Sequence, residues 1–198
     1  MRRAVAMLGL LALLLGGGVP ARAGETYDID QTYGDIGFKV HHLGLFSSAG
    51  TFRRFTGRIT IDQTHPENTR VAVVIRTASV AMDWENAASM LRSAPYFDVA
   101  RYPDARFTST RVIPRGPDRY DVEGLLELRG VTHSLVLHAA LVGQRPSGVA
   151  GQEIADFVVT GRLRRSMFGM TADPAFISDA VDLRIDARLR LYVAARAG

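Results

Sequence analysis

The chain has 198 residues, of which 47% are hydrophobic and 22% charged, the proportions of a globular domain rather than of a disordered or fibrous chain. Three of the 24 Lys and Arg residues fall within the first 23 positions, which leaves 21 basic against 20 acidic residues in the rest of the chain. This near balance argues against nucleic acid as a partner, because such binding draws on clustered positive charge. The lack of cysteine excludes disulfides, thiolate metal ligands, a thiol nucleophile and a lipid-modified cysteine.

Residues 1–23 predict a secretory signal peptide. Arg2 and Arg3 form its positive start, residues 4–15 its apolar run, and Ala21-Arg22-Ala23 a small-x-small cleavage site. We therefore expect a single exported domain over residues 24–198. The apolar run is shorter than the roughly 20 residues that cross a bilayer, so we expect neither a membrane span nor a stable membrane anchor.

The first half of the domain predicts three strands from its alternation of apolar and polar residues, over residues 36–42, 55–61 and 70–77. The alternation slips between Phe52 and Phe55, which predicts a β-bulge near Arg53 and Arg54. Residues 65–68, with the sequence His-Pro-Glu-Asn, predict a turn between the second and third strands.

Residues 83–93 interrupt the strand pattern and predict one short helix. Trp84, Ala87, Ala88 and Leu91 recur at helical spacing, and Asp83 is the expected N-cap. Such a helix would serve either as a lid over a cavity or as a packing element that closes the end of a barrel.

The second half predicts five more strands, over residues 105–113, 120–128, 131–141, 154–163 and 181–193. In the last of these, Val181, Leu183 and Ile185 face one way while Asp182 and Arg184 face the other. The predicted fold is all-β, a single antiparallel eight-stranded lipocalin-like barrel with one short helix near a barrel end. A barrel of this size is either filled by side chains or holds one ligand, and a sandwich fits the same alternation.

Several ordered motifs resemble the YceI family. They read FKVHHLG at 38–44, GTFRRFTG at 50–57 followed by Asp62, SAPYFDV at 93–99, Tyr-Pro at 102–103, FTST at 107–110, GLLELRGVT at 124–132 and FGM at 168–170. The resemblance implies a lipocalin-like barrel whose tunnel holds a polyisoprenoid, quinone or fatty-chain lipid, in a periplasmic protein. It implies no catalytic residues and no cofactor other than the lipid, and it makes a homodimer plausible.

Two stretches depart from the family pattern. Residues 87–91 read AASML where the family has a charged R-D-x-H-L, and Met167 stands where an acid is usual. Both changes make the expected cavity mouth more apolar, so the head group of the ligand can differ from the family's.

The candidate ligand-binding residues are apolar or aromatic side chains that we expect on the inward face, with one histidine. They are Phe38, Val40, His42, Phe52, Phe55, Val71, Val73, Ile75, Trp84, Met90, Leu91, Tyr96, Phe97, Phe107, Met167, Phe168 and Met170. Methionine adapts to a variable alkyl chain, and Trp84 or Tyr96 can stack on a ring. The alternative is that these residues form an ordinary packed core.

His42 shares the predicted inward face with Phe38 and Val40, so we expect it to orient the ligand head group, while His41 faces solvent. The alternative role for His42 is to satisfy backbone groups near Gly44. No nucleophile elbow, phosphate-binding glycine loop or H-E-x-x-H motif occurs in the sequence. We therefore predict a non-enzymatic lipid carrier or sequestering protein without a metal. A lipid hydrolase or isomerase using the same cavity, and a ligand-free envelope module that binds a partner protein, remain the alternatives.

Overall fold

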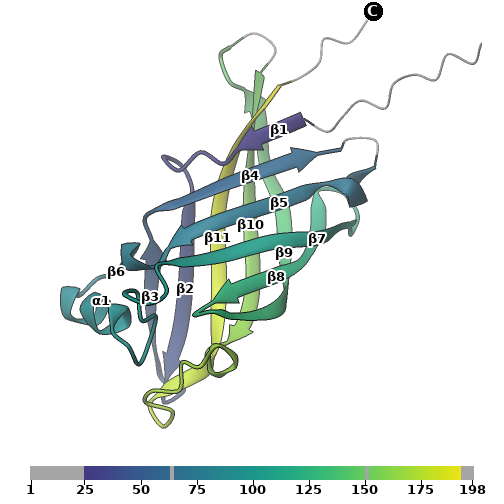
Figure 1. The fold of residues 1–198 in the computed structure, drawn as a ribbon. Helices are drawn as coiled ribbons and strands as arrows, with labels where there is room; N and C mark the ends of the chain where they lie inside the picture. The colour runs from purple at the N-terminus through teal and green to yellow at the C-terminus, as the bar shows by residue number, and fades with distance from the viewer. Residues whose placement is uncertain (1–24, 63–64, 150–151, 193–198) are drawn as a thin grey trace, which may run out of the picture.

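The computed structural model describes residues 25–62, 65–149 and 152–192 (Figure 1). The predicted signal peptide and the end of the last predicted strand, at Val193, lie outside this part of the chain. The strands are β1 Glu25–Asp28, β2 Asp35–His42, β3 Phe46–Phe52, β4 Phe55–Ile61, β5 Arg70–Arg76, β6 Val80–Met82, β7 Asp104–Pro114, β8 Arg119–Leu128, β9 Val131–Pro146, β10 Gln152–Arg164 and β11 Ile177–Tyr192. The helices are α1 Glu85–Arg92 and the short 3₁₀ helices η1 Pro66–Asn68, η2 Thr77–Ser79 and η3 Arg165–Phe168.

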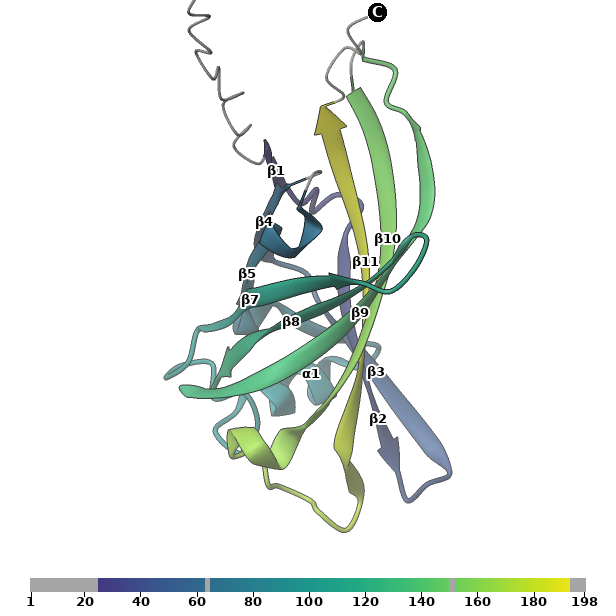
Figure 2. The ribbon, with the colours of Figure 1, turned by 90° about the vertical axis from the view of Figure 1, so that its right-hand side faces the viewer.

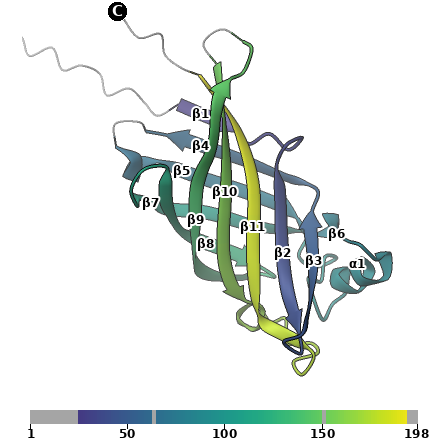
Figure 3. The same cartoon turned by 180° about the vertical axis from the view of Figure 1, so that it is seen from behind.

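The described strands form one antiparallel sheet in the order β1-β4-β5-β7-β8-β9-β10-β11-β2-β3-β6. The sheet curls strongly: β9, β10, β11, β2 and β3 run side by side as one long wall, and β4, β5, β7 and β8 cross it at a steep angle (Figures 1 and 3). The all-β class, the lipocalin-like curl and the one short α-helix among the described residues agree with the sequence prediction.

The prediction of a closed eight-stranded barrel is wrong. The described residues form an 11-stranded half-barrel whose terminal strands β1 and β6 do not pair with each other. Three of its strands were missed. β1 and β6 are short, with 4 and 3 residues, and the 7 residues of β3 read FSSAGTF, with little apolar alternation.

The predicted bulge at Arg53 and Arg54 is also wrong, because the strand ends there. β3 stops at Phe52 and β4 starts at Phe55, and the two strands occupy distant places in the sheet order. The backbone N–H of Arg53 donates to the carbonyl of Ser79 at 3.2 Å, and that of Arg54 donates to the Ser79 hydroxyl at 3.0 Å. The slip in alternation therefore marks a crossover between opposite regions of the sheet.

Two glycines allow aromatic rings to lie flat against the inner face of the sheet. Gly50 pairs with Phe38 across β3 and β2, and a Cβ atom at Gly50 would come within 2.4 Å of the Phe38 ring. A Cβ atom at Gly124 would come within 2.5 Å of the Phe107 ring. A side chain at either position would push these rings into the interior, so both glycines preserve internal space.

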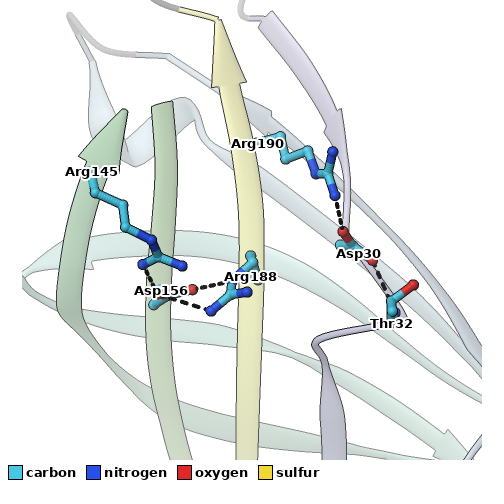
Figure 4. A network of polar contacts seen from close by, with 6 residues as sticks. All are labelled: Asp30, Thr32, Arg145, Asp156, Arg188 and Arg190. Carbon is cyan, nitrogen blue, oxygen red and sulfur yellow. Dashed lines mark hydrogen bonds and ion pairs between the residues drawn. The ribbon is translucent and has the colours of Figure 1, made fainter. Parts of the chain in front are cut away.

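The outer face of the long wall carries ion pairs across neighbouring strands (Figure 4). Asp156 on β10 accepts a hydrogen bond from Arg188 Nε on β11 at 2.6 Å, and a second from Arg145 on β9. The hydrogen bonds from Arg188 and Arg145 hold the pKa of Asp156 below its usual value. Nearby, Asp30 accepts from Arg190 Nη2 at 3.0 Å and from the backbone N–H of Thr32 at 2.9 Å.

Helix α1 lies at one end of the half-barrel, beside β6 (Figure 3). Its N-cap residue is Trp84, which makes no side-chain capping bond, so the predicted cap at Asp83 is wrong. Arg92 fixes the helix instead, because its guanidinium donates to the carbonyls of Ala78 at 3.2 Å and Val80 at 2.9 Å. No helix among the described residues is long and apolar enough to span a membrane.

Candidate functional site

The concave side of the half-barrel encloses a cavity of about 720 Å³. Its wall comes from the inward residues of the long strands, including Val181, Leu183 and Ile185 of β11. All of the residues predicted from the sequence border it except Met167 and Phe168. They are Phe38, Val40, His42, Phe52, Phe55, Val71, Val73, Ile75, Trp84, Met90, Leu91, Tyr96, Phe97, Phe107 and Met170.

Met167 and Phe168 lie elsewhere because the chain leaves β10 and turns through η3. Met167 is 47% exposed, and Phe168 is buried with its ring edge-on to His133, at 5.2 Å between ring centroids. A 3₁₀ turn does not continue the two-residue alternation of the preceding strand, so facing cannot be extrapolated through it.

Three phenylalanines form an aromatic cluster in the cavity wall. The ring centroids of Phe38 and Phe52 are 5.6 Å apart, and the Phe97 ring meets both of them edge-on, at 6.2 Å and 5.3 Å. These tilted and edge-on contacts are favourable for aromatic rings. The cluster joins β2 and β3 to the loop that follows α1.

The cavity opens beside α1. Trp84 and Met90 both border the cavity, yet Trp84 is 73% exposed and Met90 is 45% exposed. Side chains that face the cavity and the solvent at once mark its mouth. Ala88, in contrast, is fully buried on the inner side of α1. The helix is therefore packed against the fold by one face, while side chains on its outer face border the opening.

A histidine and a serine supply polar groups to the cavity wall. His42 Nε2 lies 2.8 Å from Ser48 Oγ, and both residues border the cavity from neighbouring strands β2 and β3. His41 points to the opposite face, where its Nε2 lies 3.3 Å from Asp182 Oδ2. The pair can donate to or accept from a ligand head group such as a carbonyl, hydroxyl or amide.

Sequence reasoning missed Arg165, which borders the cavity and is only 6% exposed. Its guanidinium donates to four backbone carbonyls, those of Met170, Ala172, Ile177 and Ser178, over distances of 2.7 to 3.0 Å. These bonds hold the loop between η3 and β11 against the cavity. Strand alternation gives no signal for this role, because Arg165 follows an exposed arginine in the sequence and lies just past the strand end.

Tyr96 closes the same region from the other side. Its hydroxyl donates to the Asp173 carboxylate, and Arg129 donates to its backbone carbonyl. Burial, and then the hydrogen bond to Asp173, raise the pKa of Tyr96 to about 12, so the phenol stays neutral. The ring of Tyr96 is therefore held in place as part of the cavity wall, and its hydroxyl is directed at the loop that carries Asp173.

The described residues contain no group of three or more His, Cys, Asp or Glu side chains placed to hold a metal ion. The mostly apolar wall, with a few polar residues such as His42, Ser48, Asp62 and Thr69, is the usual arrangement of a site for a small apolar molecule.

The YceI-like domain model matches residues 27–189 of this chain. UPF0312 protein plu2095 of Photorhabdus laumondii is 36% identical over 90% of this chain and 93% of its own length. Protein YceI of Escherichia coli O157:H7 is 34% identical over 93% of this chain and 96% of its own length.

Solved structures share the fold. A Campylobacter jejuni YceI protein superposes with a TM-score of 0.64 at 26% identity, over 72% of this chain and 84% of that one. BcnA of Burkholderia cenocepacia gives 0.71 at 18% identity, over 81% and 98%. A polyisoprenoid-binding domain from Saccharophagus degradans, implicated in plant cell wall breakdown, gives 0.57 at 16% identity, over 85% and 98%.

Proposed function

This chain belongs to the YceI-like domain family, and on that basis we propose that it binds one long-chain apolar lipid in its cavity and carries or sequesters it without chemical change. The ligand class is a polyisoprenoid, a quinone or a fatty-chain lipid. The working compartment is the periplasm, reached through the predicted signal peptide. No metal or further cofactor takes part.

The cavity itself is the observation that carries this proposal. Its volume of about 720 Å³ falls within the range of ligand pockets, roughly 300 to 1,000 Å³. Apolar side chains from β2, β5, β7 and β11 line it, and protein interiors rarely leave such a space unfilled. The polyisoprenoid-binding domain with the same fold supports the ligand class.

Physical chemistry explains why a lipid suits so plain a site. Each methylene group moved from water into the cavity contributes about 0.8 kcal/mol, so tail length supplies the affinity. A tail taken from a bilayer moves from one apolar environment to another, so the free energy gained on leaving water no longer contributes to binding. Selection among membrane lipids then falls to cavity shape and to polar groups such as His42 and Ser48.

Solvent extraction of the natively purified protein, followed by mass spectrometry, tests the proposal. A carrier yields an intact lipid in a ratio near one per chain. An empty protein, purified without detergent and still folded, would contradict it and favour a module that binds a partner protein.

A hydrolase is the second candidate, because His42 Nε2 and Ser48 Oγ lie within hydrogen-bond distance at 2.8 Å. Nucleophilic catalysis also needs a group that orients the histidine and donors for an oxyanion. Ser48→Ala separates the two functions. A carrier variant still holds an intact lipid, whatever its head group, whereas a hydrolase variant accumulates uncleaved substrate in place of product.

A further inference from the structure

The mouth of the cavity has an apolar rim that folding does not explain. We define the mouth rim as Leu43, Leu45, Phe46, Trp84, Met90 and Phe176, which are 66%, 79%, 72%, 73%, 45% and 62% exposed. These large apolar side chains are exposed to water, whereas the core positions of the fold bury side chains of the same kind. A gathering of exposed apolar side chains on a monomer commonly marks a binding surface.

Strand pairing brings the two halves of this rim to the same opening. Phe46 pairs with His42 and shares the inward face of β3 with Ser48, and both His42 and Ser48 border the cavity. On the other side of β3, Gly50 pairs with Met82, which leads directly to Trp84. The β2–β3 turn and α1 lie toward the same end of the half-barrel, away from β1 (Figures 1 and 2).

The turn between β2 and β3 is strained as well as exposed. Leu43 adopts a φ of +50° and Gly44 a φ of +71°. Asn, Asp or Gly is the usual choice for a turn residue with positive φ, because a bulky side chain there is unfavourable. Leu43 therefore contributes neither burial nor turn geometry to the fold, which points to a role outside it.

The rim also lacks charge along the hairpin. Residues 42–52 contain no Asp, Glu, Lys or Arg. Next to Trp84, Asp83 and Glu85 are acidic, and Glu85 is paired with Arg92 at 2.9 Å. An anionic surface would gain nothing here, so the matching partner is apolar and electrically neutral.

From these features we propose that the mouth rim docks onto the surface of a neutral phospholipid bilayer, and that the lipid ligand passes through this contact between bilayer and cavity. The inference rests on the proposed function, since it supplies the route by which such a ligand enters. An apolar tail crossing water exposes every methylene group, and direct contact between mouth and bilayer avoids that exposure. Tryptophan at the rim suits the interface between head groups and acyl chains.

A second copy of the chain is the less fitting occupant. A stable protein interface uses some 20 to 30 residues a side over about 800 Å². The mouth rim has only six side chains, which come from the β2–β3 hairpin, from α1 with the residue before it, and from the loop that ends where Ile177 pairs with His42, so it is far smaller than such an interface.

The single tryptophan of the chain provides a direct readout, because Trp84 lies in the rim. On addition of phosphatidylcholine vesicles we expect the fluorescence of Trp84 to shift to the blue, and lipids brominated in the acyl chain to quench it. Added salt should not weaken binding, because the contact is not electrostatic. No shift and no quenching with the folded wild-type protein would overturn the proposal.

The matched variants are Leu43→Asn with Phe46→Ser in the rim, and Val142→Asn on β9 as the control. Asparagine tolerates positive φ, so the turn persists. Neither rim residue borders the cavity, and Val142 is 61% exposed away from it. We expect the rim variant to lose vesicle affinity by at least about tenfold, because two large apolar side chains no longer enter the bilayer. Equal affinity in all three proteins would contradict docking through this rim.

Lipid content separates this inference from the function on which it rests. The rim variant should hold as much lipid as the wild type when purified, yet exchange it with vesicles more slowly. A lipid-free wild type that still docks would contradict the proposed function but support the docking proposal. A wild type that carries lipid but does not dock would contradict the docking proposal alone. The same holds if the rim substitutions only convert a dimer to a monomer.

Discussion

The two faces of β11 meet different demands although one alternating sequence forms both. Val181, Leu183 and Ile185 face inward and border a space that protein does not fill. On the outer face, Asp182 pairs with Arg162 at 2.6 Å, and Arg188 pairs with Asp156. The comparison teaches that the inner face is kept for binding, while the outer face ties the strands together through many weak contacts. Exposed ion pairs of this kind contribute between about 0 and 1 kcal/mol each.

Removal of Arg165 should have the largest effect, because its buried guanidinium holds backbone carbonyls beside the cavity. Arg165→Met would leave four backbone carbonyls without their donor, and we expect a loss of roughly 3 kcal/mol in the free energy of unfolding. Urea denaturation measures it. Arg164→Met, at the exposed neighbour, should change stability by less than about 0.5 kcal/mol. Similar losses in both variants would show that the carbonyl contacts of Arg165 carry no special weight.

Filling the cavity should have the next largest effect, and it should abolish lipid binding rather than prevent folding. Val73→Trp places a large ring in the cavity, so most of the bound lipid should be lost, at a cost of roughly 1 to 3 kcal/mol from overpacking. Lipid content per chain, measured after extraction, reports the loss. Val74→Trp, on the outer face, should keep its lipid. If both variants retained lipid equally, the cavity near β5 would not be where the tail lies.

The outer face should respond to pH. Hydrogen bonds from Arg188 and Arg145 lower the pKa of Asp156, so the folded state prefers the charged carboxylate. That stabilisation is fully present above the unfolded pKa, near 3.9, and is lost as the pH falls through the lower folded pKa. Asp156→Asn should therefore cost about 1 kcal/mol at neutral pH, and the gap to wild type should close in acid.

Thermal unfolding at a series of pH values below neutrality measures that gap. Asp28→Asn is the matched control, since the Asp28 side chain is 82% exposed and lies 3.5 Å from Arg58 Nε. It should follow the wild-type curve. A gap for Asp156→Asn that stays constant into acid would mean that its charge does not stabilise the fold.

The smallest effect on stability is expected at the mouth. His42→Gln retains hydrogen-bonding capacity toward Ser48, so the free energy of unfolding should change by less than about 0.5 kcal/mol. The identity of the retained lipids should change, because a neutral imidazole and an amide favour different head groups. His41→Gln on the outer face should change neither quantity. Identical lipid profiles in all three proteins would reassign His42 to bonding within the sheet.

The sequence alone determined which residues form the long strands and which face each side chain takes. This holds for β5 and β11, where Val73 borders the cavity from its predicted inward face and Leu183 borders it from the predicted apolar face of its strand. Strand facing is local, since successive side chains point to opposite sides whatever the rest of the chain does. The existence of α1 was predictable for the same reason, from apolar spacing within a few turns.

Only the tertiary structure decided how the strands are assembled and where the alternation of apolar and polar residues stops predicting which way side chains face. The break at Arg53 and Arg54 depends on Ser79, a partner 25 residues from Arg54 in sequence, so local pattern could show a slip but not a crossover. The burial of Arg165 depends on carbonyls that arrive from the following loop. The half-barrel likewise results from pairing between distant strands such as β2 and β11. Pairing between segments far apart in the chain is chosen by packing as a whole, and no short window of sequence contains it.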